Sequence, residues 1–346
     1  MQSMALTGTR RMEPRTVPVP ALVNDSDVLI KMARVGVCGS DVHYFAEGGI
    51  GSQRVQYPWT VGHEGAGVVT EVGAAVTRVE PGDRVAIDPA QPCGVCDQCQ
   101  AGRPHTCRRL DFLGCPGQVE GCLSEYLVMP EGSCYPIPDS MTLEEAATVE
   151  PLSIGLYAWT LADLAPGAFI GILGAGPIGL SVLLPAKADG VGRVYQTDKI
   201  DARLAVAHKA GADWTGNPDT VDVIAAVTER EPKLLDAVFE CSGEQDAMDQ
   251  GVELLKPGGT LLLIGIPGAT NRVSFDINLL RRKELRIQNV RRQNGCVQPA
   301  IDLIASKKID ISPMITHRLP FARTPEGFDM VAGYNDGVVK AMIEIG

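Results

Sequence analysis

The sequence predicts an α/β protein in which a mainly antiparallel β domain is joined to a doubly wound parallel sheet. In the amino-terminal half, short strand-like runs alternate with turn residues such as Pro81-Gly82. From Gly167 onward, strand-like and helix-like stretches alternate instead, which is typical of a parallel sheet covered by helices. With 346 residues, the chain is long enough for about two domains of this kind.

The overall composition argues against several classes of protein. The chain carries 31 basic and 42 acidic residues, and its formal net charge of −11 disfavours the phosphate neutralisation that nucleic-acid binding requires. The chain contains no run of 18 or more apolar residues, the length needed to span a membrane. Residues 1–17 lack the apolar core of a secretory signal. We therefore expect a cytoplasmic protein. Its ten cysteines then indicate metal binding or reduced thiols rather than disulfides.

The first candidate ligands follow a predicted strand at residues 27–35. The next segment contains glycine and aspartate, and it predicts a turn and a short helix. It reads Gly36-Val-Cys38-Gly-Ser40-Asp41-Val-His43-Tyr44-Phe45. Cys38 and His43 are potential metal ligands or proton relays, although either residue taken alone is more often structural.

A second pair of candidate ligands lies between glycines. His63 and Glu64 are adjacent and are flanked by Gly62 and Gly65, which permit a constrained backbone that could point both side chains the same way. A His-Glu pair on a surface usually has no special role, so this signal depends on its surroundings. The segments that follow, 68–72 and 82–87, predict strands of the antiparallel sheet.

Four cysteines within fifteen residues predict a metal site. Cys93, Cys96 and Cys99 have successive two-residue spacers, and Cys107 lies eight positions further. Four thiolates suit tetrahedral zinc and leave no open coordination position, so we expect a structural zinc site. Reduced thiols or an iron–sulfur cluster are the alternatives. The nearby His105 is interpreted as a surface residue, because the four-cysteine set is already complete.

An acidic residue precedes an apolar helical run near position 150. Residues 121–128 predict another strand, and Thr142 is a candidate cap for a helix that begins at Leu143. Glu150 then stands before apolar residues, where an isolated charge would be costly to bury. A metal ion or a cationic partner would offset that cost.

A glycine-rich loop lies between a predicted strand at 168–173 and a predicted helix. Gly174, Gly176 and Gly179 have the G-x-G-x-x-G spacing, in which the first glycine makes the turn, the second lets a pyrophosphate approach, and the third allows close helix–strand packing. Free N–H groups at the helix start would hold the phosphates. Pro185 lies further along this helix, where proline typically kinks the helix or costs about 3 kcal/mol.

An acidic residue stands at the position that selects the cofactor. Asp198 ends the predicted strand 193–197 and lies nineteen residues past Gly179, where an acid bonds the ribose 2′-hydroxyl and repels a 2′-phosphate. This favours NAD over NADP. The alternative is an ordinary helix cap before residues 200–209. Lys199 and Arg203 oppose the NAD assignment in part, since either could reach a 2′-phosphate.

The remaining elements continue the alternation of strand and helix. Further strands are predicted at 236–240, 260–266 and 285–290, and helices at 200–210, 221–228 and 245–255. The tail after Arg291 returns to short mixed elements that lack a core of their own, so we expect it to complete the first domain.

Taken together, these segments resemble the zinc-containing medium-chain dehydrogenases, and among them the sorbitol/xylitol (polyol) dehydrogenase branch. The resemblance covers nearly the whole chain and rests on the motifs quoted above together with Val149-Glu150-Pro-Leu-Ser-Ile-Gly155. It implies a GroES-like catalytic domain formed by residues 1–152 and 293–346, and a Rossmann domain formed by residues 153–292. It also implies a homo-oligomer, either a tetramer or a dimer.

The resemblance further implies two zinc ions and NAD, with specific roles for site residues. A catalytic zinc would be bound by Cys38, His63 and Glu64, with Glu150 as a further ligand or as the residue that holds the zinc-bound water. Relatives that act on simple alcohols carry a cysteine in place of Glu150, so at this position the chain resembles the polyol enzymes. Asp41 is implied as the carboxylate that orients His63, and Ser40 with His43 as a proton relay. The implied pocket residues are Tyr44, Phe112 and Arg291. The implied cofactor-binding residues are Gly174, Gly176, Pro177, Ile178, Gly179, Asp198 and Arg203.

The activity implied is oxidation of a secondary hydroxyl of a polyol to a ketose, with hydride transfer to NAD⁺. The polyol could be of the sorbitol, xylitol, galactitol or arabinitol type. Arg292 stands where sorbitol-type relatives tend to have an aromatic residue, and Arg291 with Arg292 could suit an acidic substrate. Another secondary alcohol, such as threonine or a sugar acid, is therefore the alternative. A non-catalytic nucleotide-binding protein is a remote alternative, because every expected zinc ligand is present.

Overall fold

The computed structural model describes residues 1–267 and 272–346, which fold into two compact units. The first unit comprises Met1–Glu150, Val297–Ser306 and Ile315–Gly346, and the second comprises Pro151–Cys296 and Lys307–Met314. Both units are built from more than one chain segment. The sequence-based domain limits, at 152/153 and 292/293, lie near the changes from one unit to the other at 150/151 and 296/297. Residues 307–314 belong to the second unit, whereas the prediction placed all of residues 293–346 in the first domain.

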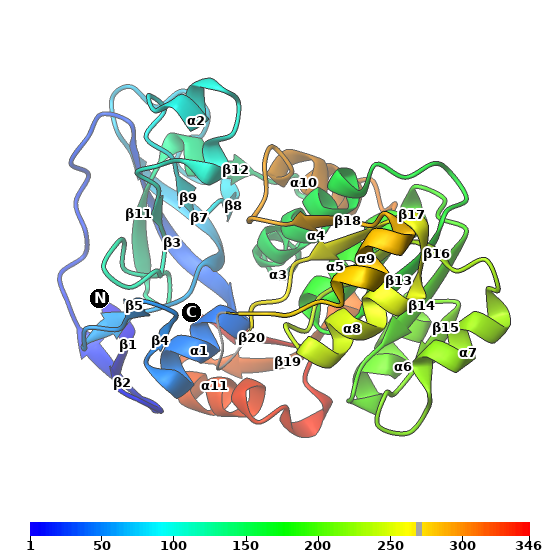
Figure 1. The fold of residues 1–346 in the computed structure, drawn as a ribbon. Helices are drawn as coiled ribbons and strands as arrows, with labels where there is room; N and C mark the ends of the chain where they lie inside the picture. Colours follow the sequence, from blue (N-terminus) through cyan, green and yellow to red (C-terminus); the bar gives the residue numbers. More distant parts are fainter. Residues whose placement is uncertain (268–271) are drawn as a thin grey trace. The chain divides into compact units, whose positions relative to one another are not determined.

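The first unit contains a seven-stranded sheet with the order β12-β8-β7-β3-β20-β19, in which β11 also pairs with β3. All pairs are antiparallel except β19 with β20, which confirms the mainly antiparallel prediction. The strands are β3 (Asp27–Gly36), β7 (Glu64–Val72), β8 (Arg84–Ile87), β11 (Tyr126–Pro130), β12 (Cys134–Pro136), β19 (Ile315–Pro320) and β20 (Lys340–Glu344). β20 comes from the carboxyl-terminal end of the chain and lies beside the central strand β3 (Figure 1).

Smaller elements complete this unit. Its short strands are β1 (Gln2–Gly8), β2 (Arg11–Thr16), β4 (Gly49–Ile50), β5 (Gln53–Arg54), β6 (Trp59–Thr60), β9 (Ala90–Gln91) and β10 (Asp111–Phe112). Its helices are α1 (Gly39–Glu47), α2 (Asp97–Gln100), α3 (Leu143–Ala147), α10 (Val297–Ala305) and α11 (Thr324–Ala332). The strand predicted at 121–128 begins only at Tyr126, so that prediction was wrong for its first five residues.

The core of the first unit forms around β3. Val28, Ile30 and Val35 on this strand are fully buried, because β3 is a central strand whose two faces are both covered. Helix α1 packs on α11 through Phe45 and Phe328, whose rings meet edge to face at 5.5 Å between centroids. This packing fixes α1 in place, and α1 carries several of the predicted site residues.

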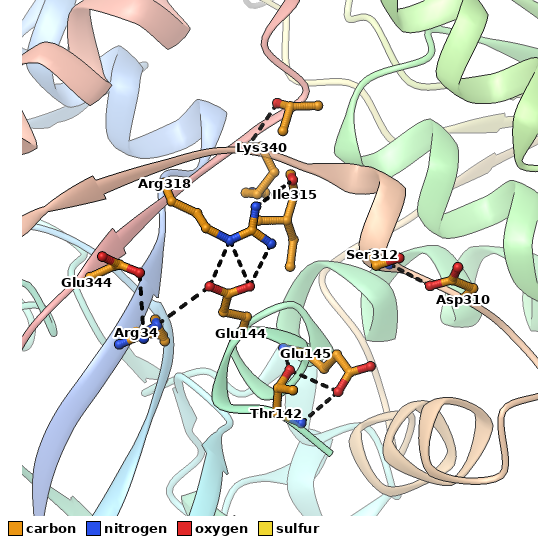
Figure 2. A network of polar contacts seen from close by, with 11 residues as sticks. Arg34, Thr142, Glu144, Glu145, Asp310, Ser312, Ile315, Arg318, Lys340 and Glu344 are labelled. Atoms are coloured by element: carbon orange, nitrogen blue, oxygen red, sulfur yellow. Dashed lines mark hydrogen bonds and ion pairs between the residues drawn. The ribbon is translucent and has the colours of Figure 1, made fainter. Parts of the chain in front are cut away.

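A network of charged side chains joins α3 to the sheet (Figure 2). Arg318 on β19 donates to the Glu144 carboxylate through Nε at 2.9 Å and Nη2 at 2.8 Å, and Arg34 on β3 lies between Glu144 and Glu344. The hydrogen bonds from Arg318 lower the pKa of Glu144. Thr142 forms a capping box with Glu145, which confirms the predicted helix start.

The second unit contains a six-stranded parallel sheet with the order β15-β14-β13-β16-β17-β18 (Figure 1). This strand order is that of a dinucleotide-binding fold, so the doubly wound prediction is confirmed. The strands are β13 (Phe169–Leu173), β14 (Arg193–Thr197), β15 (Trp214–Gly216), β16 (Leu235–Glu240), β17 (Leu255–Leu263) and β18 (Arg286–Asn289). Sequence reasoning missed the three-residue strand β15 and placed the start of β17 too late.

Helices accompany this sheet in alternation with its strands. They are α4 (Val149–Ala162), which begins in the first unit, and α5 (Pro177–Ala188), α6 (Asp201–Lys209), α7 (Val223–Arg230), α8 (Gln245–Leu254) and α9 (Ile277–Lys283). Helix α5 packs on β13, and α8 packs on β13, β16 and β17. None of the helices in residues 1–267 and 272–346 combines the length and apolar character needed to cross a bilayer.

Helix α5 continues through Pro185 to Ala188. Because proline has no N–H, the carbonyl of Ser181 loses its usual donor four residues later. That carbonyl lies against Gly155 of α4, where a Cβ would stand 2.3 Å from the Ser181 oxygen. A glycine at position 155 is therefore required for the close contact between α4 and α5.

Candidate functional site

The structure brings Cys38, His63 and Glu64 together. β3 ends at Gly36, Cys38 precedes the first residue of α1, and the register of β3 with β7 places Glu64 opposite Gly36. One ligand atom from each of the three residues lies within 4.8 Å of the others. Gly36 makes room for this arrangement, because a Cβ at that position would stand 2.1 Å from Oε2 of Glu64. The set of one sulfur, one nitrogen and one oxygen suits zinc with an open position.

The His63 imidazole is held by Asp41. Nδ1 of His63 lies 3.3 Å from Oδ1 of Asp41, and that oxygen also accepts a hydrogen bond from the backbone N–H of Gly62. Nε2 of His63 is then the ring nitrogen left for a metal ion. Burial alone lowers the pKa of His63, but the charges of Asp41 and Cys38 outweigh it and raise the pKa well above the ordinary value. The surroundings of His63 therefore favour a positive charge.

A buried lysine that sequence reasoning missed binds the carboxylate of Glu64. Nζ of Lys340, on β20, lies 2.6 Å from each carboxylate oxygen of Glu64 and 3.2 Å from the carbonyl oxygen of Val37. Both charged side chains are only 1% exposed. The signal in the sequence was a lone lysine within an otherwise apolar stretch at 338–343, since a buried lysine requires a partner.

Glu150 is buried in the first turn of α4 and close enough to interact electrostatically with the same cluster. The pKa of Glu150 is raised to about 7, chiefly by burial; Glu64 also raises it, whereas His63 and Lys340 lower it. A carboxyl group with a pKa near neutrality can exchange a proton at physiological pH. This agrees with the expected buried carboxylate beside a cationic site.

The two residues predicted as a proton relay have different surroundings. The Ser40 hydroxyl donates to Sγ of Cys38 at 3.3 Å, so Ser40 lies at the cluster. The His43 ring nitrogen Nδ1 instead lies 2.8 Å from Oε1 of Glu47, and the His43 side chain is 28% exposed. His43 is thus partly accessible to water, and its role with Ser40 as a proton relay stays a prediction.

Two predicted pocket residues line this part of the first unit. The Phe112 ring on β10 packs 5.4 Å from the His63 ring. The Tyr44 hydroxyl lies 3.7 Å from Sγ of Cys115, which also accepts a hydrogen bond from Nε2 of Gln53 at 2.9 Å. Cys115 and Gln53 were not among the predicted residues, and neither belongs to a recognisable motif. In the second unit, Arg291 is exposed and Arg292 adopts a left-handed backbone with φ of 54°.

The four predicted cysteines also converge. Cys93, Cys96, Cys99 and Cys107 form a cluster whose sulfur atoms lie within 4.8 Å of one another. A hydrogen bond from the backbone of Val95 lowers the pKa of Cys93 to about 6, whereas burial raises that of Cys99 to about 12. All ten cysteines of the chain are free thiols in the structure. The interpretation of His105 as a surface residue was wrong, because its side chain is 5% exposed within the same lobe.

The glycine loop of the second unit has the geometry that its spacing predicts. Gly174 has a φ of 115°, which favours glycine, and a Cβ on Gly179 would stand 1.9 Å from the Gly174 oxygen. Gly176 precedes α5, whose first two residues are Pro177 and Ile178. The Arg203 guanidinium lies beside this turn, with Nη1 3.5 Å from the place of a Gly176 Cβ. A cation next to free N–H groups suits a phosphate.

Asp198 contacts the glycine loop directly. Its Oδ2 accepts a hydrogen bond from the backbone N–H of Ala175 at 2.7 Å, and its Oδ1 accepts one from the N–H of Ile200 at 2.9 Å. The residue that caps α6 is Ile200, so Asp198 is not the ordinary helix cap that was its alternative reading. Asp198 therefore lies at the turn where a dinucleotide binds in this fold.

Comparison with known proteins identifies both halves of the chain. Residues 24–139 match the family model of the alcohol dehydrogenase GroES-like domain, and residues 177–306 match that of the zinc-binding dehydrogenases. The chain is 33% identical to a sorbitol dehydrogenase of Bacillus subtilis over 99% of this chain and 97% of that protein. It is 34% identical to D-xylulose reductase A of Aspergillus oryzae over 95% and 93%.

A solved structure agrees with these matches. A putative zinc-binding dehydrogenase from Sinorhizobium meliloti, crystallised with NADP, superposes with a TM-score of 0.90 at 30% identity and covers 99% of this chain and 98% of that one. Similarity of this extent, together with two clusters of side chains that could hold a metal ion, leads to one conclusion: the chain belongs to the family of zinc-binding medium-chain dehydrogenases, and it is an oxidoreductase with a GroES-like domain and a Rossmann domain.

Proposed function

We propose that this protein oxidises a secondary hydroxyl of a polyol, of the sorbitol, xylitol, galactitol or arabinitol type, to a ketose with NAD⁺ as the hydride acceptor. The observation that carries the proposal is the convergence of Cys38, His63 and Glu64, with Glu150 in electrostatic contact. The names of the relatives, a sorbitol dehydrogenase and a D-xylulose reductase, support the substrate class.

In this proposal the side chains of the first unit hold the metal ion and move the proton. Cys38, His63 and Glu64 would hold a catalytic zinc, which when bound supplies the Lewis acid that lowers the pKa of an alcohol. Asp41 fixes the ring of His63 through Nδ1. Glu150, buried beside the ligands, accepts the hydroxyl proton, and the His43 ring, which is 28% exposed, passes a proton to water. Phe112 packs on His63 and excludes water from one side.

The second unit would hold the cofactor. The N–H groups at the start of α5 and the guanidinium of Arg203 suit the pyrophosphate, while Gly174, Gly176 and Gly179 allow its close approach. The carboxylate of Asp198 supports NAD, because a 2′-phosphate would be repelled there. Arg203 is the residue that could instead accept a 2′-phosphate, and the Sinorhizobium relative was crystallised with NADP.

The proposal is tested by initial rates of NADH formation at fixed NAD⁺ with sorbitol, xylitol, galactitol, L-arabinitol, threonine and a sugar acid. We expect one polyol to give the largest kcat/KM, and Cys38→Ser to abolish that activity while retaining the zinc of the four-cysteine site. Activity with the sugar acid alone would favour the second candidate, for which Arg291 and Arg292 would recognise the carboxylate. A protein that binds NAD⁺ but oxidises none of these would contradict the proposal.

We also propose that the protein is a homo-oligomer, either a dimer or a tetramer. All four residues of the edge strand β18 are exposed, and Ile277 on the neighbouring helix α9 is 69% exposed. Exposed strand edges and apolar side chains favour association with another chain. Light scattering after size-exclusion chromatography gives the mass directly, and a monomer at micromolar concentration would contradict this part of the proposal.

A further inference from the structure

The ammonium group of Lys340 contacts both carboxylate oxygens of Glu64, which is a candidate zinc ligand. Lys340 is the first residue of β20, and its ammonium group lies 2.6 Å from Oε1 and 2.6 Å from Oε2 of Glu64. Lys340 pairs with Ile315 of β19, and β20 pairs with β3 from Met342 onward, which together fix the lysine backbone; the third contact of the ammonium is the carbonyl oxygen of Val37. Ammonium and carboxylate are thus held in one geometry without access to water.

The charges around this pair are mostly negative. Glu64 is joined by Asp41, which is fully buried, and by Cys38 and Glu150, both of which act electrostatically on Lys340. His63 and the buried thiol of Cys122 are further titratable groups at this cluster. Buried carboxylates are costly in a medium of low polarity unless a positive charge lies beside them. Lys340 supplies a permanent positive charge at this place whether or not a metal ion is bound.

A zinc ion and Lys340 compete for the same carboxylate. An ion that coordinates Glu64 must take one of the two oxygens that Lys340 now engages, and the ammonium then lies beside a second cation. Lys340 therefore stabilises the metal-free site more than the loaded site. By thermodynamic linkage, a group with this preference weakens metal binding by the same factor.

We infer that Lys340 is a positioning residue that keeps Glu64 in its ligating place and makes the zinc of the Cys38–His63–Glu64 site exchangeable. The inference rests on the proposed function only in taking these three side chains as zinc ligands. Its consequence is an asymmetry between the two metal sites. The cations that face the four-cysteine cluster, Arg108 beside Cys96 and Arg109 beside Cys93, are exposed to solvent, whereas Lys340 is buried against its ligand, so the zinc of the four-cysteine site should be retained more firmly.

The test compares the wild-type holoenzyme with Lys340→Met, which keeps the length and loses the charge, and Lys340→Arg, which keeps the charge. Zinc release to a chelator is followed with time, and the slower four-cysteine zinc serves as the internal reference. We expect Lys340→Met to release the Cys38–His63–Glu64 zinc roughly tenfold more slowly, within the range usual for coupling between two bound groups. Lys340→Arg should behave as the wild type.

A second measurement separates this role from ordinary packing. We expect Lys340→Met to lower the melting temperature of chelator-treated protein more than that of zinc-loaded protein. In the variant, the buried carboxylate of Glu64 lacks a positive partner only when no zinc is bound. If Lys340→Met does not fold, Lys340→Gln is measured in the same way. Equal losses of melting temperature in both forms, or zinc release at an equal or faster rate, would overturn the inference.

The same data distinguish the failure of this inference from the failure of the proposed function. A wild-type protein that binds one zinc per chain, or a Cys38→Ser variant that still binds two, would show that the three side chains are not a zinc site. Two zinc ions in the wild type, one in Cys38→Ser and unchanged release in Lys340→Met would leave the site intact and reject the role of Lys340.

Discussion

Oδ2 of Asp198 lies 2.7 Å from the backbone nitrogen of Ala175, so the end of β14 is tied to the glycine loop that follows β13. The two residues are 23 positions apart in sequence. This bond places a carboxylate beside the turn that Gly174 and Gly176 form. Asp198 thus has a structural role in shaping the loop in addition to the proposed role in selecting the cofactor.

Replacing Asp198 by alanine should shift the preference from NAD towards NADP. Removing the carboxylate removes its repulsion of a 2′-phosphate, and like charges about 4 Å apart cost roughly 1 to 4 kcal/mol, so we expect the NADP-to-NAD ratio of kcat/KM to rise roughly tenfold or more. Steady-state rates with both cofactors measure this ratio. Asp201→Asn, an exposed neighbour bonded to Asn217, is the matched control and should leave the ratio unchanged. An unchanged ratio in Asp198→Ala would assign the choice of cofactor to other residues.

Replacing Asp41 by asparagine should weaken zinc binding and activity together. The carboxylate holds Nδ1 of His63, and loss of a residue that orients a metal-binding histidine typically costs about 10- to 100-fold in metal affinity or activity. Zinc content after dialysis against a weak chelator, measured beside kcat/KM, tests this. The control is Asp27→Asn, a buried carboxylate that bonds the backbone of Val23 and Asn24 and should affect stability alone. Full zinc retention in Asp41→Asn would reject the orienting role.

The features that sequence could predict are those whose chemistry is encoded by local spacing. The cysteine lobe and the glycine loop each lie within fifteen residues, and their geometry follows from the backbone of a single segment. The Cys38–His63–Glu64 cluster joins two segments, but each of the segments carries its own unusual residue pattern. Five of the six strands of the parallel sheet were predicted because their apolar runs alternate with helices, and the three-residue strand β15 was missed.

The features that sequence could not predict depend on pairs of residues far apart in the chain. Lys340 meets Glu64 across 276 positions, and Arg318 meets Glu144 across 174. The lone lysine in an apolar stretch indicates burial, but no local pattern identifies the partner in either pair, because the pairing of β20 with β3 and with β19 brings these residues together. His105 was placed at the surface because the four-cysteine set was already complete without it, and the fold of the cysteine lobe buries it.

Replacing Cys99 by serine should remove one zinc ion and destabilise the lobe without removing the other zinc. Three thiolates and a hydroxyl hold zinc much more weakly than four thiolates, and binding energy at a structural zinc site contributes directly to folding. Metal analysis should give about one zinc per chain, and the lobe should become sensitive to limited proteolysis. Cys241→Ser, a cysteine at the end of β16 outside both clusters, is the control and should retain two. Two zinc ions in Cys99→Ser would contradict the assignment of the four-cysteine site.

Replacing Glu150 by glutamine should stabilise the chelator-treated protein relative to the wild type, and the difference should grow as the pH rises. The pKa of Glu150 is raised from 4.5 to about 7, chiefly by burial. Below pH 4.5 the group is protonated in both the folded and unfolded states. Between 4.5 and 7 the unfolded chain loses the proton that the folded protein keeps, so the free energy of unfolding falls as pH rises; above 7 the loss is constant.

The glutamine variant cannot lose this proton, so its stability relative to the wild type should rise between pH 5 and pH 8, by up to about 3 kcal/mol for a shift of this size. Melting temperatures of both proteins over that range measure the difference. Glu144→Gln is the control: hydrogen bonds from Arg318 lower the pKa of Glu144, so its stability contribution changes only below its ordinary pKa and should be constant from pH 5 to pH 8. A difference between wild type and Glu150→Gln that does not vary with pH would show that Glu150 titrates outside this window, and would remove the basis for its role as the proton acceptor at neutral pH.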